Sequence, residues 1–139
     1  RSFSFQEFSQ RYANPNDMDE TFVIREARMQ DPKNRQNSVA VDDPALSAEW
    51  RMRQQDVIET AKLHYNWAIS NGIAKEQARA VLPEGNTVSR LYANGTIRSW
   101  IHYVELRSAN GTQKEHMELA VAVGEAIAAI FPMMKGETE

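Results

Sequence analysis

Cysteine is absent from the 139 residues, so the chain contains neither disulfides nor thiolate metal ligands. No run of 18 or more apolar residues occurs, which excludes a membrane-spanning segment from this sequence. The glycines are scattered and form no phosphate-binding loop. The three histidines, His64, His102 and His116, lack the spacing of metal ligands, so we predict no metal site. The lack of cysteine is compatible with a reducing compartment, and we expect a cytoplasmic protein.

The chain also lacks a large excess of positive or negative charge. The formal net charge is only −3, which argues against a nucleic-acid-binding protein. An anionic ligand must therefore be held by local arginines. Apolar residues make up 42% of the chain, enough for a hydrophobic core, and the length suits a single domain over residues 1–139. Because Arg1 leads directly into a strand-like run, we expect the natural N-terminal portion to be missing.

Alternating polar and aromatic residues predict a strand within residues 1–12, and apolar runs predict further strands over 21–27 and 87–93. The polar stretch 28–43 reads as a long loop. Helical spacing and stop signals predict helices over 44–70, 74–80, 96–107 and 113–131. The residues expected to form the apolar stripes of the two longest helices are Trp50, Val57, Ala61, Tyr65 and Ala68, and Leu119, Ala120, Val123, Ala126, Ile127 and Ile130.

Polar side chains recur at spacings that suit ligand binding. Glu7, Ser9 and Arg11 share one face of the first strand, where a hydroxyl and a guanidinium can meet one anion. Arg98 and His102 are four residues apart and share a helix face, whereas Arg107 lies about half a turn away. Each has an ordinary alternative. The strand row is equally a polar sheet edge, His102 an interface histidine, and Arg107 a charge that complements the helix dipole by about 0.3–1 kcal/mol.

Three segments in order resemble the flavin-dependent thymidylate synthases, the ThyX family. That family is marked by Arg-His-Arg, seven residues, then Ser, continuing to Arg-Tyr. Here Arg1, Ser9 and Arg11-Tyr12 are in register with it. The segment Ala-Arg-Ala-Val-Leu-Pro at 78–83 matches a second family motif, and the Arg-Ser helix that ends in Leu-Arg, followed by Gln-x-Glu, matches at 98–115. The resemblance thus covers nearly the whole chain.

The sequence also departs from the family pattern. The first Arg and the His of the signature lie before residue 1, and Gln6 stands where the family usually has Asn. The Asn-Ala-Arg that usually precedes the late helix reads Thr96-Ile97-Arg98 here. These differences concern positions near the flavin.

The resemblance implies a fold, a reaction and a set of site residues. The fold is α+β, with a small, mainly antiparallel sheet packed with helices. The enzyme methylates dUMP to dTMP with methylenetetrahydrofolate as carbon donor and FAD, reduced by NADPH, as hydride carrier, and it is a homotetramer with shared active sites. Arg107, which would reach the uracil ring, is implied to be catalytic. The residues implied to bind dUMP are Glu7, Ser9, Gln10, Arg11, Arg79 and Arg107, and those implied to bind FAD are Arg1, Arg98, His102 and Gln113.

Two other classes of function remain open. The chain could be a nucleotide- or flavin-binding module without turnover, or a structural oligomerisation domain in which the arginines are surface charges. Arg79 and Gln113 show the ambiguity locally. Arg79 is either a surface arginine or an anion ligand among apolar neighbours, and Gln113 with Glu115 is either an ordinary helix start or part of a flavin site.

Overall fold

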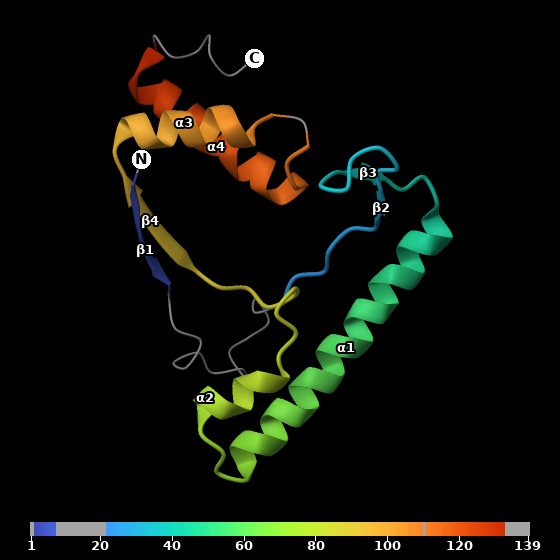
Figure 1. Ribbon diagram of the computed structural model, residues 1–139. Coiled ribbons are helices and arrows are strands. Elements are labelled where there is room, and N and C mark those ends of the chain that lie inside the picture. The colour runs from blue at the N-terminus through green and yellow to red at the C-terminus, as the bar shows by residue number, and fades with distance from the viewer. Residues whose placement is uncertain (1, 8–21, 110, 133–139) are drawn as a thin grey trace. The chain divides into compact units, whose positions relative to one another are not determined.

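Residues 2–7, 22–109 and 111–132 are described by a computed structural model of the chain (Figure 1). The chain forms two compact units. The first comprises residues 1–5, 28–40 and 93–139, and the second residues 6–27 and 41–92. Each unit is described by itself below.

Helix α1 (Pro44–Ser70) has the bounds that the sequence predicts. The Asp43 carboxylate accepts hydrogen bonds from the backbone N–H groups of Ala45 and Leu46, at 2.9 and 3.1 Å, so it caps the first turn. Pro44, whose fixed φ suits the first helical position, follows it. Just beyond the helix end, Gly72 has a backbone φ of +77°, a conformation that residues other than glycine rarely adopt.

The buried stripe of α1 is rotated from the predicted one. Ala61, Tyr65 and Ala68 are buried as expected, but Trp50 and Val57 are half exposed, so the prediction that they are buried is wrong. Gln54 and Ile58 are buried instead. The physical reason is that segment 22–25 packs against the Gln54 side of the helix.

Two short helical segments follow α1. Helix α2 (Lys75–Ala78) continues into the 3₁₀ turn η2 (Arg79–Val81), in agreement with the helix predicted over 74–80. Figure 1 shows α2 beside the C-terminal end of α1. The contact is apolar, because Ala78 joins Tyr65 and Ala68 in one buried cluster, against which Ile69 and Leu82 pack.

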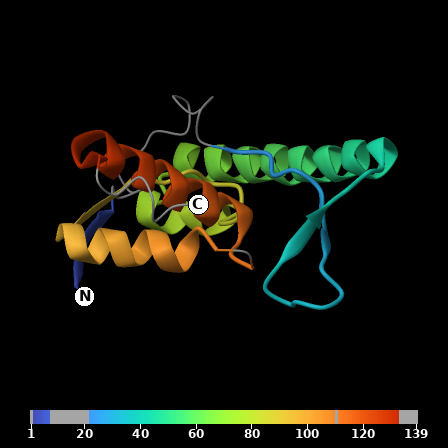
Figure 2. The same cartoon turned by 90° about the horizontal axis from the view of Figure 1, so that it is seen from above.

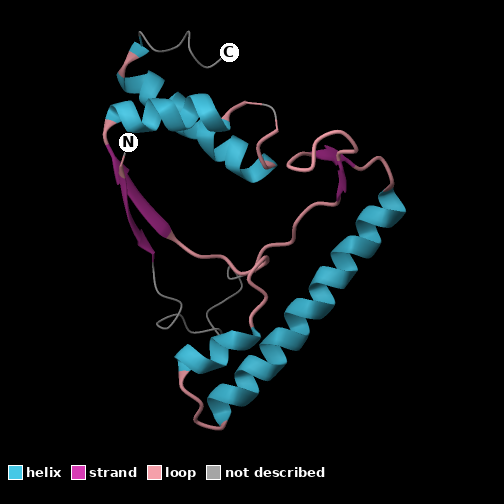
Figure 3. Cartoon of the chain, viewed as in Figure 1, coloured by secondary structure: helices cyan, strands magenta, loops and turns pink. Residues whose placement is uncertain are grey.

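The loop predicted over 28–43 is wrong, because the segment contains a hairpin. Strands β2 (Arg28–Gln30) and β3 (Ser38–Ala40) pair antiparallel, with Met29 opposite Val39 (Figure 3). Polar side chains organise the turn. Asp31 accepts hydrogen bonds from the backbone N–H groups of residues 33 and 34 and from the Asn37 amide, and these bonds lower its pKa. A composition that reads as loop therefore hides short strands whose turn is built from side-chain hydrogen bonds.

The strand predicted over 21–27 does not form within its described part, residues 22–27. Phe22 makes one isolated antiparallel bridge to Thr87, and the Val23 N–H donates to the Asn86 carbonyl at 2.8 Å. At Arg25, the backbone N–H and carbonyl instead form hydrogen bonds with the side chain of Gln54. A side chain thus replaces the neighbouring strand.

Strand β1 (Phe3–Glu7), inside the predicted 1–12 run, pairs with β4 (Leu91–Gly95). The latter begins later than the predicted 87–93. Phe3 lies against Gly95, and Glu7 against Ser89, so the two strands run antiparallel. A Cβ atom at Gly95 would lie 2.6 Å from the Phe3 ring, so this close approach requires glycine.

Helices α3 (Ile97–Arg107) and α4 (Lys114–Ile130) pack side by side, as Figures 1 and 2 both show. The buried positions of α4 are Ala120, Gly124 and Ala128, small residues that recur every four positions and allow close approach. Leu119 and Ile130, which the sequence places in the buried stripe, are exposed at 56% and 73%. Of the other predicted positions, Ala120 is buried, Val123 and Ile127 are half-buried, and Ala126 is exposed.

The described elements therefore form an α+β fold with small antiparallel sheets and four α-helices, as expected from the sequence. None of the described helices combines the length and the apolar character that a membrane-spanning segment needs.

Candidate functional site

Helix α3 carries three of the predicted site residues, and its ends are locally determined. The Thr96 hydroxyl accepts a hydrogen bond from the Ser99 N–H at 3.2 Å and so caps the first turn. At the other end, the Ser108 hydroxyl donates to the Val104 carbonyl at 2.6 Å. The helix stops at Arg107, which leaves this side chain exposed at its last turn.

One face of α3 presents Arg98, His102 and Glu105. The His102 Nδ1 lies 3.6 Å from Glu105 Oε2, and Arg98 is exposed one turn before His102. Within the described part of the chain, Arg98 has no carboxylate partner. The predicted sharing of a face by Arg98 and His102 follows from the helical geometry of 97–107. This face can offer a cation and an imidazole to one ligand.

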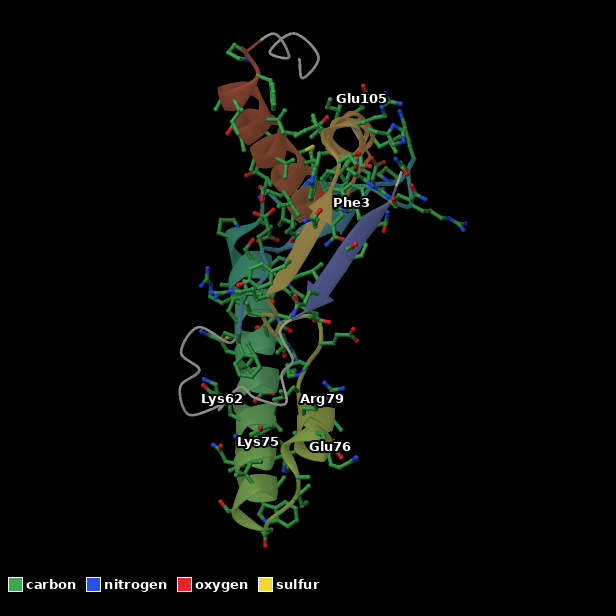
Figure 4. All side chains as sticks on the ribbon, turned by 90° about the vertical axis from the view of Figure 1, so that its left-hand side faces the viewer. Phe3, Lys62, Lys75, Glu76, Arg79 and Glu105 are labelled. Carbon is green, nitrogen blue, oxygen red and sulfur yellow. The ribbon has the colours of Figure 1, made fainter. Side chains whose placement is uncertain are left out.

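The opposite side of α3 carries Trp100, Tyr103 and Arg107. Phe3 of β1 packs its ring against Trp100 with 4.8 Å between centroids, edge to face. In Figure 4, Phe3 lies on the strand side of α3 and Glu105 on the other. Burial raises the pKa of Tyr103, and the positive charge of Arg107 acts in the opposite direction. The phenol of Tyr103 therefore keeps its proton at neutral pH.

Gln113 caps α4 with its backbone alone. Its side chain makes no capping bond and instead donates from Nε2 to Glu115 Oε2 at 3.0 Å. Glu115 is acidic in the first turn, which suits the positive end of the helix dipole. The exposed Gln113 amide has a carbonyl oxygen that can accept a hydrogen bond.

In the second unit, Glu7 and Arg79 are the described site residues. Glu7 accepts a hydrogen bond from the Ser89 hydroxyl at 2.7 Å, which fixes one carboxylate oxygen. Arg79 is exposed at the start of η2 and has no carboxylate partner among the described residues (Figure 4). Its neighbour Ala78 and the nearby Leu82 are anchored on α1, so its backbone is held firmly.

The remaining predicted site residues, Arg1, Ser9, Gln10 and Arg11, lie outside the described residues. The structure therefore supplies geometry for Glu7, Arg79, Arg98, His102, Arg107 and Gln113. It brings Arg98 together with His102 on one face of α3, and Arg107 onto the other.

Two contributions were missed by the sequence reasoning. Gln54 is buried and joins Arg25 and Asn86 to α1, and Tyr103 packs against the ring of His116 four residues before Arg107. A signal existed for Gln54, because it falls in register with Ile58, Ala61 and Tyr65 at helical spacing. Tyr103 offered the four-residue spacing to Arg107.

An apolar cavity of about 410 Å³ lies along α3 and α4, lined by Val104, Ser108, Val121, Gly124, Glu125, Ala128 and Ala129. None of the described site residues lines it. Among the described residues, no group of three His, Asp or Glu side chains is arranged to hold a metal ion.

Comparison with known proteins identifies the family. The sequence profile of the thymidylate synthase complementing proteins matches residues 1–133. The chain is 48% identical over 132 residues to a probable flavin-dependent thymidylate synthase of Paramecium bursaria Chlorella virus 1, covering 95% of the chain and 59% of that protein. It is 45% identical over 139 residues to the flavin-dependent thymidylate synthase of Synechocystis, covering all of the chain and 62% of that protein.

A solved structure is similar as well. The UMP/dUMP methylase PolB from Streptomyces cacaoi, bound with 5-Br UMP, matches 93% of the chain and 60% of its own with a TM-score of 0.72 and 27% identity. The chain thus spans about three-fifths of the length of the curated relatives named above. With the motif residues in register and one profile matching nearly all of the sequence, the chain belongs to the family of the thymidylate synthase complementing proteins, which includes the flavin-dependent thymidylate synthases.

Proposed function

We propose that this chain belongs to an enzyme that methylates dUMP to dTMP, with methylenetetrahydrofolate as carbon donor and FAD, reduced by NADPH, as hydride carrier. The observation that carries the proposal is the profile match over residues 1–133, which contains every predicted site residue. The relatives' names supply the flavin and the reaction. In the part of the chain that the structure describes, Arg79, Arg98 and Arg107 are exposed and have no carboxylate partner, so they are suited to anions.

The substrate site is proposed to use Glu7, Ser9, Gln10, Arg11, Arg79 and Arg107. An exposed guanidinium on a firmly held backbone, as at Arg79, suits the two oxygens of a phosphate. The Glu7 carboxylate, oriented by Ser89, is placed to accept from a nucleoside hydroxyl or ring N–H. Arg107 is assigned to the uracil ring. Its fixed positive charge would stabilise the negative charge that builds up on the pyrimidine carbonyl when hydride adds at C6, and it is therefore the proposed catalytic residue.

The flavin site is proposed to use Arg1, Arg98, His102 and Gln113. When bound, FAD supplies the hydride chemistry that amino-acid side chains lack. Arg98 and His102 project from one face of α3, and Gln113 begins the adjacent α4. The exposed Arg98 guanidinium and the half-buried His102 imidazole suit a polar, anionic cofactor. His102 is partly engaged by Glu105, which orients its ring and leaves the other nitrogen free for a ligand.

We further propose self-association into a homotetramer in the cytoplasm. Support comes from apolar side chains exposed in the described residues, including Trp50 and Trp67 on α1 and Leu119 and Ile130 on α4. Exposed apolar stripes of this kind are typical of surfaces buried by another protein chain.

The test uses the full natural chain and its Arg107→Ala variant. FAD is added, excess is removed by desalting, and the visible spectrum is recorded before and after dUMP. We expect retained flavin bands that shift with dUMP in the wild type, and about a hundredfold weaker dUMP response in the variant, as removal of a charged ligand contact typically costs. Arg51→Ala, on an exposed position of α1, is the matched control. Equal behaviour of the two variants would sink the role of Arg107.

The same assay separates the other classes of function. Flavin retention with a dUMP response but without dTMP formation indicates a binding module, and absence of both responses indicates a structural domain. The similarity to PolB favours one further candidate, a uridylate methylase. Measuring turnover with dUMP and with UMP decides between them, because a site built around deoxyribose discriminates against the 2′-hydroxyl.

A further inference from the structure

The Tyr103 ring is held by aromatic neighbours from three elements. The Trp100 ring, on the same helix, meets it edge on at 5.6 Å between centroids and 87° between planes. Phe3 of β1 approaches at 6.5 Å and 72°, and His116 of α4 at 5.5 Å and 38°. Edge-to-face and tilted contacts of this kind are favourable and leave the ring little freedom to rotate. Tyr103 is therefore the centre of a fixed aromatic wall.

Arg107 follows Tyr103 by four residues and lies on the same side of α3. This placement agrees with the positive charge of Arg107 acting to lower the Tyr103 pKa. Arg107 itself is exposed, ends the helix, and has no carboxylate partner among the described residues. An arginine so placed has many rotamers to lose when it binds a ligand, unless a neighbouring group restricts them beforehand.

We propose that Tyr103 is a positioning residue that holds the Arg107 guanidinium in the orientation needed for the pyrimidine ring of the substrate. The inference rests on the proposed role of Arg107. The rigid face of the ring, fixed by Phe3, Trp100 and His116, provides the wall, and the hydroxyl is secondary. The phenol keeps its proton at neutral pH, because burial raises its pKa above the ordinary value. It therefore does not neutralise the arginine by forming an ion pair.

Plain packing is the competing explanation, and coupling distinguishes the two. If Tyr103 only stabilises the contact between α3, α4 and β1, its loss weakens dUMP binding to the same degree whether or not Arg107 is present. If Tyr103 acts through Arg107, its loss matters only while the arginine is there. A double-mutant cycle measures this difference.

The experiment measures the dUMP dissociation constant for full-chain Tyr103→Ala, Tyr103→Phe, Arg107→Ala and the Tyr103→Ala/Arg107→Ala double variant, by calorimetry, or by ligand-observed NMR where binding is weak. We expect Tyr103→Ala to weaken binding about tenfold and Tyr103→Phe by less than about twofold. Adding Tyr103→Ala to Arg107→Ala should cause no further loss. Tyr92→Ala, an exposed tyrosine on β4, is the matched control.

Distinct outcomes overturn distinct claims. An equal tenfold loss in both backgrounds, or a Tyr103→Ala variant that behaves as Tyr92→Ala does, overturns the positioning role. A full loss in Tyr103→Phe overturns the assignment to the ring. If Arg107→Ala binds dUMP normally, the proposed function of Arg107 fails instead. Should Tyr103→Ala fold poorly, His116→Ala removes one side of the wall instead. We then expect dUMP binding to weaken roughly threefold when Arg107 is present and to stay unchanged in the Arg107→Ala variant.

Discussion

Replacing Gln54 with leucine tests the interior of the second unit. Gln54 is 4% exposed, and its amide makes four hydrogen bonds. Its Oε1 accepts from the Arg25 N–H at 2.8 Å and the Asn86 amide at 3.0 Å, and its Nε2 donates to the Arg25 and Trp50 carbonyls at 2.9 and 3.3 Å. The change to leucine removes both bonds between the Gln54 side chain and the backbone of Arg25.

The cost follows from which partners remain satisfied. The Trp50 carbonyl keeps its place in the helix, and the Asn86 amide still donates to the Val23 carbonyl at 2.9 Å. The N–H and carbonyl of Arg25 each lose their bond to the buried Gln54 amide, and each lost bond costs about 1–3 kcal/mol. The added apolar burial of leucine offsets about 1 kcal/mol. We therefore expect the free energy of unfolding to fall by about 1–5 kcal/mol.

The assay is urea unfolding of the full chain, with Gln55→Leu as the matched control. Gln55 is the adjacent residue, is exposed, and undergoes the same chemical change, so its effect should stay within about 0.5 kcal/mol. Hydrogen exchange at the Arg25 amide adds a local measurement, because its protection should be lost only in the Gln54 variant. Equal midpoints for both variants and unchanged Arg25 protection would refute the reasoning.

Three further predictions concern single positions. Gly95→Ala should lower the free energy of unfolding by about 1–3 kcal/mol, because the new Cβ meets the packed Phe3 ring. Gly85→Ala is the control for thermal melts and should cause no such loss, because no atom lies within 4 Å of a Cβ there. Asp31 should titrate below its usual value in a carboxyl NMR titration, so its contribution to hairpin stability is present above the unfolded pKa and is lost as pH falls through the folded one. Tyr103 should ionise above pH 10 in an absorbance titration at about 295 nm, and Tyr103→Phe should remove this absorbance change. The stability that the neutral phenol contributes should be lost as pH rises through its folded pKa.

Helix boundaries were predictable because capping chemistry is local. Asp43-Pro44, Asn71-Gly72 and Thr96 each act within one turn of the chain, and the helices begin and end at them. The faces of the helices were less predictable. Trp50 and Gln54 are separated by only one turn, and which of them is buried depends on where segment 22–25 packs, which periodicity does not encode.

The prediction of strands from the sequence was less successful for a related reason. The run Phe22-Val23-Ile24 has the composition of a strand, but its backbone is satisfied by Asn86 and Gln54 rather than by a sheet. The hairpin at 28–40 has the composition of a loop, yet it pairs because polar side chains close its turn. Short strands depend on partners that are distant in sequence, so composition alone predicts them poorly.

The motif residues were located by resemblance, and the structure places on one helix the residues for which two different tasks are proposed. Helical geometry places Arg98 and His102 on one side of α3 and Arg107 on the other, so two ligands that must react with each other can be bound from a single rigid element. The aromatic wall lies on the Arg107 side, and the His102–Glu105 contact lies on the opposite side. Rotation of α3 would displace both sets together and keep their angular relation, which makes the packing of Phe3 on Gly95 and Trp100 as relevant to the proposed reaction as the charged residues themselves.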